Sequence, residues 1–450
     1  MNQKSDLLNG SISAGILKFT WPLFLANLFQ QLYNVVDSLI VGNFLGSTEL
    51  AAVTSTGSLI FLFVGFFNGT ATGAGVVISK YYGMGDHDKL RRAIHTDVAF
   101  GLACGALMTL LGVIFAPQIL ILMGTPAEVL PLSTTYLRIY FAGSMTIIMY
   151  ANLTGALQAV GDSTHPLIYL LISAVINVVL DYVFIAILGF SVGSAAVATV
   201  ISQGLAAALC FAQLLGTKEI YRVHLSEIRF HKEMITQMLR LGLPSGVQNS
   251  VISIANVVVQ SHINSFGEFA MAGNGIYAKL NGFAFLPVTC FSMSMTTFIG
   301  QNLGAKQYDR AKKGAKFGLC ACLITAECIG LLVRFSIGGF AKFFTDVPAV
   351  IEYSVTEAHI ESFFFFLLAF DHCVSGIMRG AGKAIVGMIG MLTFWCVIRV
   401  AYITIVTSFI PDIRVVFWAY PLTWFLCAVF LLIYFIKADW IHGLDRSEVL

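Results

Sequence analysis

Long apolar runs separated by short polar connections are the main feature of this sequence. Twelve of these runs are long enough to cross a membrane as helices, since about 20 residues span a hydrocarbon core of about 30 Å. The runs are too long for barrel strands, and lipid offers no partner to an unpaired backbone polar group, so we expect helices. The predicted spans are residues 16–44, 50–79, 93–115, 131–158, 164–189, 193–215, 235–265, 270–300, 314–336, 351–380, 384–409 and 414–437.

Composition agrees with a membrane protein and excludes several other classes. Of the 450 residues, 57% are hydrophobic and only 11% are charged, against about 25% charged residues in a soluble domain. The net charge of +2 is divided among the loops, so we expect no nucleic-acid partner. Nearly all of the nine cysteines fall in apolar runs, which predicts buried thiols and neither a disulfide framework nor a metal cluster. The polar first 15 residues do not fit a cleavable signal, so we expect the first helix to be retained.

Basic residues are distributed unevenly between the two sides of the predicted helices. When the N-terminus, the even-numbered connections and the C-terminus are placed on one side, that side holds 20 of the 26 Lys and Arg residues. The positive-inside rule then predicts a multi-pass protein of the cytoplasmic membrane with both termini in the cytoplasm.

The second half of the chain repeats the first. The matched pairs are Pro22 with Pro244, Gly83 with Gly304 and Gly155 with Gly376, all at an offset of 221 or 222 residues. The predicted organisation is a six-helix lobe at 1–215, a cytoplasmic linker at 216–233 and a second six-helix lobe at 234–450. Because six is an even number, both copies insert the same way up, related by a pseudo-twofold axis along the membrane normal. This architecture is typical of transporters.

Ionisable residues deep in a predicted span are costly and indicate function. Asp37 in the first span and Asp181 in the fifth both lie roughly 10–12 Å inside the outer boundary, at about 1.5 Å per residue. Asn177 precedes Asp181 by four residues and shares its helix face. Thr199 in the sixth span lies at a similar depth. These four residues are our candidate site.

The candidate site offers only oxygen ligands, from two carboxylates, an amide and a hydroxyl. Such a set suits a hard cation such as sodium. It suits a proton equally well, because burial and a like-charged neighbour favour the neutral form of a carboxyl group. We expect no organic cofactor and no metal other than sodium at this site.

The sequence resembles the multidrug and toxic compound extrusion (MATE) family over essentially its whole length. The stretches that carry the resemblance begin at Asp37 (DSLIVGNFLG), Ile78 (ISKYYGMGD), Ala159 (AVGDSTHP) and Asn177 (NVVLDYVFI). The resemblance implies two lobes in a V shape and the export of amphiphilic toxic compounds, driven by inward flow of sodium or protons. It is closer to the DinF-like prokaryotic branch.

That branch implies roles for particular residues of this chain. Its first-lobe cation site corresponds here to Asp37, Asn177, Asp181 and Thr199. Asn34, one turn before Asp37 on the same face, is a candidate for lining the site and its cavity, or else has a plain packing role.

The second half carries two cationic residues within its predicted spans. Lys279 and Arg399 either pair with Glu327, Glu361 or Asp371 inside the lobe, or line a cavity between the lobes. Cavity-lining cations would favour an alternative function, a flippase for a lipid-linked sugar or cell-wall precursor of the same superfamily, since they suit phosphate head groups.

A cation-coupled antiporter exporting amphiphilic drugs is the function that these observations favour. A membrane enzyme would require a cluster of catalytic His, Cys or Ser and Lys residues, and the sequence contains none. A channel would require similar pore-lining polarity in both halves. The spacing in Gly69–Gly73 and in Gly101–Gly105 predicts close packing between helices of one chain, and we expect a monomer in the lipid bilayer.

Overall fold

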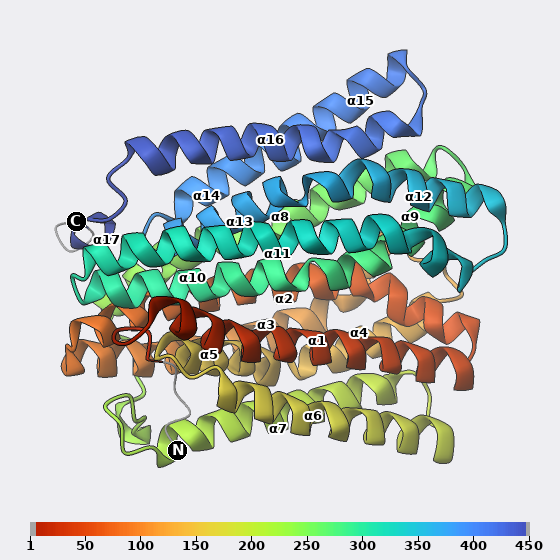
Figure 1. Cartoon of the computed structure of the whole chain (residues 1–450). Helices are drawn as coiled ribbons and strands as arrows, with labels where there is room; N and C mark the ends of the chain where they lie inside the picture. The colour runs from red at the N-terminus through yellow and green to blue at the C-terminus, as the bar shows by residue number, and fades with distance from the viewer. Residues whose placement is uncertain (1–5, 447–450) are drawn as a thin grey trace. The chain divides into compact units, whose positions relative to one another are not determined.

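The computed structural model describes residues 6–446, and every regular element within that range is helical (Figure 1). The elements of the first half are α1 (Ile12–Phe44), α2 (Ser47–Met84), α3 (His87–Leu122), α4 (Leu130–Ala142), α5 (Ser144–Ala159), α6 (Thr164–Asp181), the π-helix η1 (Tyr182–Ile187) and α7 (Gly193–Gly216). The short 3₁₀ helix η2 (Leu225–Glu227) lies in the connection to the second half. The elements that follow are α8 (Lys232–Asn264), α9 (Glu268–Ala284), α10 (Leu286–Gly304), α11 (Tyr308–Lys342), α12 (Pro348–Glu361), η3 (Ser362–Phe364), α13 (Phe365–Gly380), α14 (Ala384–Met391), the π-helix η4 (Leu392–Ile398), α15 (Arg399–Phe409), α16 (Ile413–Lys437) and α17 (Gly443–Arg446).

The helices correspond to the predicted spans one by one. Within the described range, ten helical runs are long and apolar enough to cross a membrane, and some of them, such as α9 with α10 and α12 with α13, combine two helices. The remaining two predicted spans are the α4–α5 pair, which is divided into two short helices, and α8, which is more polar. The prediction of an all-α polytopic membrane protein is therefore confirmed.

Two spans are interrupted at matching places in the repeat. The fourth span divides into α4 and α5 at Gly143, where an added Cβ would meet Val200 Cγ2 of α7 at 2.1 Å. The tenth span divides into α12 and α13 at Ser362–Phe364, about 221 residues later. The duplication thus extends to irregularities that the apolar pattern did not reveal.

The packing divides the chain into two compact units. The first unit holds Trp21–Gly246, and the second combines Leu7–Thr20 with the chain from Val247 onward. α1 and α8 therefore each belong to one unit at their start and to the other thereafter. Both helices contain a proline near the change, Pro22 in α1 and Pro244 in α8. Because proline lacks the backbone N–H of a helical hydrogen bond, these helices are weakened where they pass between units.

Close glycine contacts hold the first half of α8 against α2 inside the first unit. A Cβ added at Gly73 would lie 2.2 Å from the backbone nitrogen of Gly242, and one added at Gly69 would lie 2.4 Å from that of Gly246. The two pairs have the same four-residue spacing and face each other. The close packing expected at Gly69–Gly73 is confirmed, and its partner is a second glycine pair that the sequence analysis did not single out.

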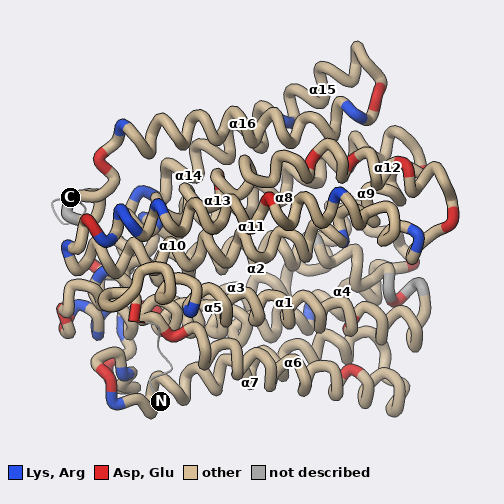
Figure 2. The backbone as a smooth tube through the Cα atoms, viewed as in Figure 1, with Lys and Arg blue, Asp and Glu red and all other residues tan. Residues whose placement is uncertain are grey.

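Lys and Arg gather at one end of the helices within each unit. Figure 2 shows them concentrated around the α2–α3 connection in the first unit and around the α10–α11 connection in the second. These are the connections that the positive-inside rule assigns to the cytoplasm.

Candidate cation-binding site

An apolar cluster joins the C-terminal half of α1 to α4, to α6 with its extension η1, and to α7. Its buried members are Ile40, Val41, Tyr136, Ile185, Val192, Ala195 and Ala196. Asp37, Asp181 and Thr199 each lie four residues along their helix from a member of this cluster. Because residues four apart share a helix face, this packing turns the three side chains toward one region of the first unit.

The carboxyl groups of Asp37 and Asp181 are the centre of that region. They lie close enough to interact directly with each other. Asp181 is fully buried and neither of its carboxyl oxygens has a hydrogen-bond partner within the described residues, and the same is true of Oδ1 of Asp37. Two carboxylates facing each other in a buried site repel unless a proton or a cation lies between them.

Asn177 adds an unsatisfied amide to the same site. It is 1% exposed, and neither its Oδ1 nor its Nδ2 has a hydrogen-bond partner within the described residues. It lies one turn before Asp181, and α6 ends at Asp181 and continues as the π-helix η1. Such π-helical turns are rare and are often found at functional sites. The amide carbonyl is therefore available to a ligand.

Thr199 lies on α7 and is more exposed than Asn177 and Asp181. Its hydroxyl is half-buried and donates to the backbone carbonyl of Ala195 at 3.0 Å, so its lone pairs remain free to accept or to coordinate. The cation-binding role of Asp37, Asn177, Asp181 and Thr199 remains a prediction, which their placement supports.

Tyr33 and Tyr136 lie near the carboxyl pair and Gln203 contacts Tyr33, and none of the three was predicted from the sequence. The Tyr33 hydroxyl accepts hydrogen bonds from Gln203 Nε2 at 3.1 Å and from Gln30 Nε2 at 2.7 Å. Tyr33 and Tyr136 both lie close enough to Asp37 and Asp181 to interact electrostatically. The sequence held a signal for two of them, because Tyr33 lies four residues before Asp37 and Gln203 lies four after Thr199.

The candidates for a cavity lining lie in different surroundings. Asn34 is exposed, one turn before Asp37 on α1. Lys279 is exposed on α9, with its ammonium 5.0 Å from the centre of the Phe344 ring. The roles of Asn34 and Lys279 as cavity-lining residues stay predictions.

Arg399 is only 2% exposed and lies inside the second unit. Its guanidinium donates two hydrogen bonds to Thr423 Oγ1, at 3.0 and 2.9 Å, and lies 4.2 Å from the centre of the Tyr420 ring. It is also close enough to Glu361 and Asp371 for electrostatic attraction. These contacts agree with the pairing interpretation.

The second unit contains a buried carboxyl pair of its own, of which the sequence analysis recognised only one member. Glu357 and Glu361 lie four residues apart on α12 and are each 2% exposed. Glu357 Oε1 accepts from the amide of Asn274 at 2.7 Å, and Glu361 Oε2 accepts from the Tyr277 hydroxyl at 2.9 Å. The four-residue spacing was visible in the sequence, but the partners on α9 were not.

Solved structures share this fold over the whole chain. The chain matches an outward-facing multidrug resistance MATE family transporter of the MOP superfamily with a TM-score of 0.89 and 20% identity, covering 100% of this chain and 99% of that one. It matches a MOP superfamily transporter from Pyrococcus furiosus, described as having a binding pocket of reversed polarity, with the same TM-score and identity over 98% of that chain.

Sequence relatives lead to the same family. The probable multidrug resistance protein YoeA of Bacillus subtilis (strain 168) is 29% identical over 322 residues, which is 70% of each chain. The MatE family model matches the chain twice, at residues 22–183 and 244–405, so the two matches begin and end 222 residues apart, the difference of 244 and 22. The internal repeat inferred from the sequence is therefore a duplication of the family's own unit, and the chain belongs to the MatE family of membrane transporters.

Proposed function

We propose that this chain exports amphiphilic drugs and other toxic compounds across the cytoplasmic membrane in exchange for sodium ions or protons. Family membership already makes it a transporter and not an enzyme. Export of drugs is supported by its relatives, which include the multidrug export protein MepA of Staphylococcus aureus (strain N315), 23% identical over 370 residues or 82% of this chain. The coupling mechanism and the orientation with both termini in the cytoplasm are our own inferences.

The observation that carries the ion coupling is the pairing of half-buried Asp37 with fully buried Asp181. These carboxyl groups come from different helices, face each other, and have no basic side chain within ion-pair distance in the described part of the chain. A bound cation or proton would relieve their repulsion and hold α1 against α6. Loss of that charge would favour separation of the two helices.

Exchange then requires that the drug bind more tightly to the conformation of the first unit to which the cation binds less tightly. A coupling free energy of about 1–3 kcal/mol between the two ligands is enough to alter each affinity by about 5- to 150-fold. α1 can bend at Pro22, because proline has no backbone N–H to donate to a helical hydrogen bond. Movement of the Asp37 half of α1 about Pro22 would connect ion occupancy to the packing of the unit.

The flippase alternative receives less support from Arg399, and it then depends on the exposed Lys279. It required Lys279 or Arg399 to present positive charge to a phosphate-bearing lipid, whereas the contacts of Arg399 are with Thr423, Tyr420 and carboxyl groups of its own unit. Its charge is thus already compensated.

Transport in proteoliposomes with independently imposed sodium and pH gradients tests the proposal. Asp37→Asn and Asp181→Asn should each reduce gradient-driven drug export by about 5- to 150-fold, because each removes one charge of the pair. Asp346→Asn makes the same change at an exposed position in the second unit and should leave export unaltered. The gradient that drives wild-type export identifies the ion, and unchanged export in both site variants would exclude the coupling role.

A further inference from the structure

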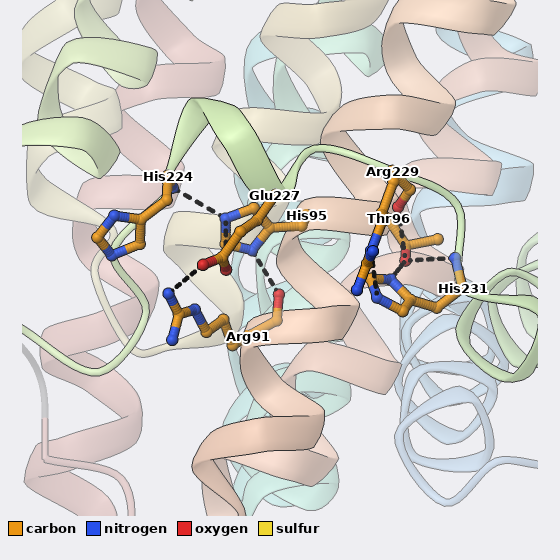
Figure 3. Close-up of polar contacts among 7 residues, drawn as sticks. All are labelled: Arg91, His95, Thr96, His224, Glu227, Arg229 and His231. Atoms are coloured by element: carbon orange, nitrogen blue, oxygen red, sulfur yellow. Dashed lines mark hydrogen bonds and ion pairs between the residues drawn. The ribbon is translucent and has the colours of Figure 1, made fainter.

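The connection between α7 and α8 is fastened to the first turns of α3 by three histidine and arginine contacts (Figure 3). The backbone N–H of His224 donates to His95 Nε2 at 2.9 Å, and that of His231 donates to Thr96 Oγ1 at 3.3 Å. Between these two points, Arg91 forms an ion pair with Glu227. The connection therefore lies over α3 and is held at both ends.

A pocket of about 240 Å³ lies between the connection and α3. Its lining residues are Asp88, Arg91, Arg92, His95, Ser226, Glu227, Arg229 and His231. At about 30 Å³ for each water molecule, it can accommodate a phosphate group with part of its hydration. All of its lining residues belong to the first unit.

The pocket has guanidinium groups that its own carboxylates do not neutralise. The carboxylate of Glu227 already forms an ion pair with Arg91. Within the described residues, neither Arg92 nor Arg229 has a carboxylate within ion-pair distance. Asp88 also lines the pocket and opposes an anion there, so two uncompensated guanidinium groups face one carboxylate.

His231 contributes hydrogen-bonding capacity rather than charge. Burial lowers the pKa of His231, and the nearby positive charges of Arg229 and Arg92 and the His95 ring lower it further. Arg229 Nε donates to its Nε2 at 3.4 Å, and its Nδ1 lies 3.1 Å from Thr96 Oγ1. The neutral ring thus orients the Arg229 side chain beside the pocket.

A second pocket with basic residues lies at the matching connection of the other unit, although the counterpart of Arg92 does not line it. In the second unit, a pocket of about 540 Å³ lies at the α10–α11 connection, beside the chain that follows the last membrane helix. Its lining residues are Lys306, Gln307, Tyr308, Asp309, Arg310, Lys312, Ile441 and His442. At the repeat offset of 221, Asp88 and Arg91 correspond to Asp309 and Lys312. A basic pocket covered by the chain after the sixth helix is therefore a property of both copies.

We propose that the pocket in the first unit binds a phosphate group between Arg92 and Arg229, and that the bound phosphate ties the connection at 224–231 to α3. Planar guanidinium groups match the oxygens of a phosphate with paired hydrogen bonds. One arginine is on α3 and the other on the connection, so a shared phosphate joins the two segments. The phosphate group is that of an anionic lipid of the inner leaflet or of a soluble phosphate compound.

Hydrogen–deuterium exchange of the purified full-length chain distinguishes these sources. In detergent, inorganic phosphate should slow exchange of the amides at 224–231 relative to chloride at the same ionic strength. In nanodiscs without phosphate, phosphatidylglycerol should slow the same amides relative to phosphatidylcholine if the group comes from a lipid. Protection by inorganic phosphate but not by phosphatidylglycerol indicates a soluble phosphate compound. Protection by phosphatidylglycerol, with or without protection by phosphate, indicates a lipid, and protection by neither overturns the proposal.

Substitutions locate the effect at the pocket. Arg92→Gln and Arg229→Gln should each weaken the response roughly tenfold, because each removes charged hydrogen bonds to the anion. Lys218→Gln removes a positive charge from the same connection outside the pocket and should leave the response unaltered. Protection that persists when Arg92 and Arg229 are both replaced would contradict the assignment.

Discussion

The two units bury carboxyl groups in contrasting surroundings. In the first, Asp37 and Asp181 face each other, and neither oxygen of Asp181 receives a hydrogen bond within the described residues. In the second, one oxygen of each of three fully buried acidic residues receives a hydrogen bond from a neutral donor: Asn274 for Glu357, Tyr277 for Glu361 and Trp395 for Asp371. The second unit also buries Arg399 near two of these acids.

This difference separates a site that needs a ligand from one that supplies part of its own compensation. A buried charge is costly unless it is paired and hydrogen-bonded. The second unit meets part of that requirement with its own side chains, although one oxygen each of Glu357, Glu361 and Asp371 has no hydrogen-bond partner within the described residues. The first unit leaves Asp181 without any such partner, and we expect a cation or a proton to take that place. The repeat thus copied the scaffold and not the charge balance.

Removal of Arg399 should produce the largest effect on stability. Arg399→Met leaves Glu361 and Asp371 without their buried positive neighbour, and breaking a buried charge pair costs about 3–5 kcal/mol. The free energy of unfolding in mixed micelles measures the loss, and Glu361→Gln in the same chain should restore part of it. Arg414→Met, at an exposed position, is the control. A loss no larger than that of the control would show that the second unit is not compensated in this way.

Cation binding should respond to the acids of the first unit only. Sodium or added protons should raise the unfolding temperature of the wild-type chain, because a ligand that binds the folded state stabilises it. Asp181→Asn should weaken the apparent affinity by about 1.5–3 kcal/mol, or roughly 10- to 150-fold. Glu357→Gln should leave the affinity within about twofold, since Asn274 already serves that carboxyl group. Equal losses in both variants would remove the distinction between the units.

The sequence was sufficient to predict the helices and the repeat, because membrane crossing imposes a length and an apolar composition on each helix. It was also sufficient for residues on one helix face, such as Asn177 and Asp181, since a spacing of four fixes their neighbourhood. The facing of Asp37 toward Asp181 was inferred from similar depth and from family resemblance. Spacing alone carries no information about contacts between helices.

Other features depend on such contacts and could not be predicted. Glu357 accepts a hydrogen bond from Asn274 only because α12 packs on α9. Gly73 lies against Gly242 only because α2 packs on the first half of α8. The interruption at Gly143 likewise reflects a neighbour, Val200. Apolar composition is similar on all sides of a membrane helix, so the pattern does not identify which faces pack together.

The smallest effect, and the sharpest in sign, concerns Asn177. Replacing a buried, hydrogen-bonded amide normally lowers the free energy of unfolding by about 1 kcal/mol. The Asn177 side chain has no hydrogen-bond partner within the described residues, so its replacement breaks no such bond. Without a cation, Asn177→Leu should therefore leave the free energy of unfolding unaltered or raise it by up to about 1 kcal/mol, while it weakens stabilisation by the cation. Asn152→Leu is the matched control, since Asn152 is equally buried and donates to the carbonyl of Asp97 at 3.3 Å. If both variants lose stability alike in the absence of a cation, the amide of Asn177 serves the fold and is not held for the ion.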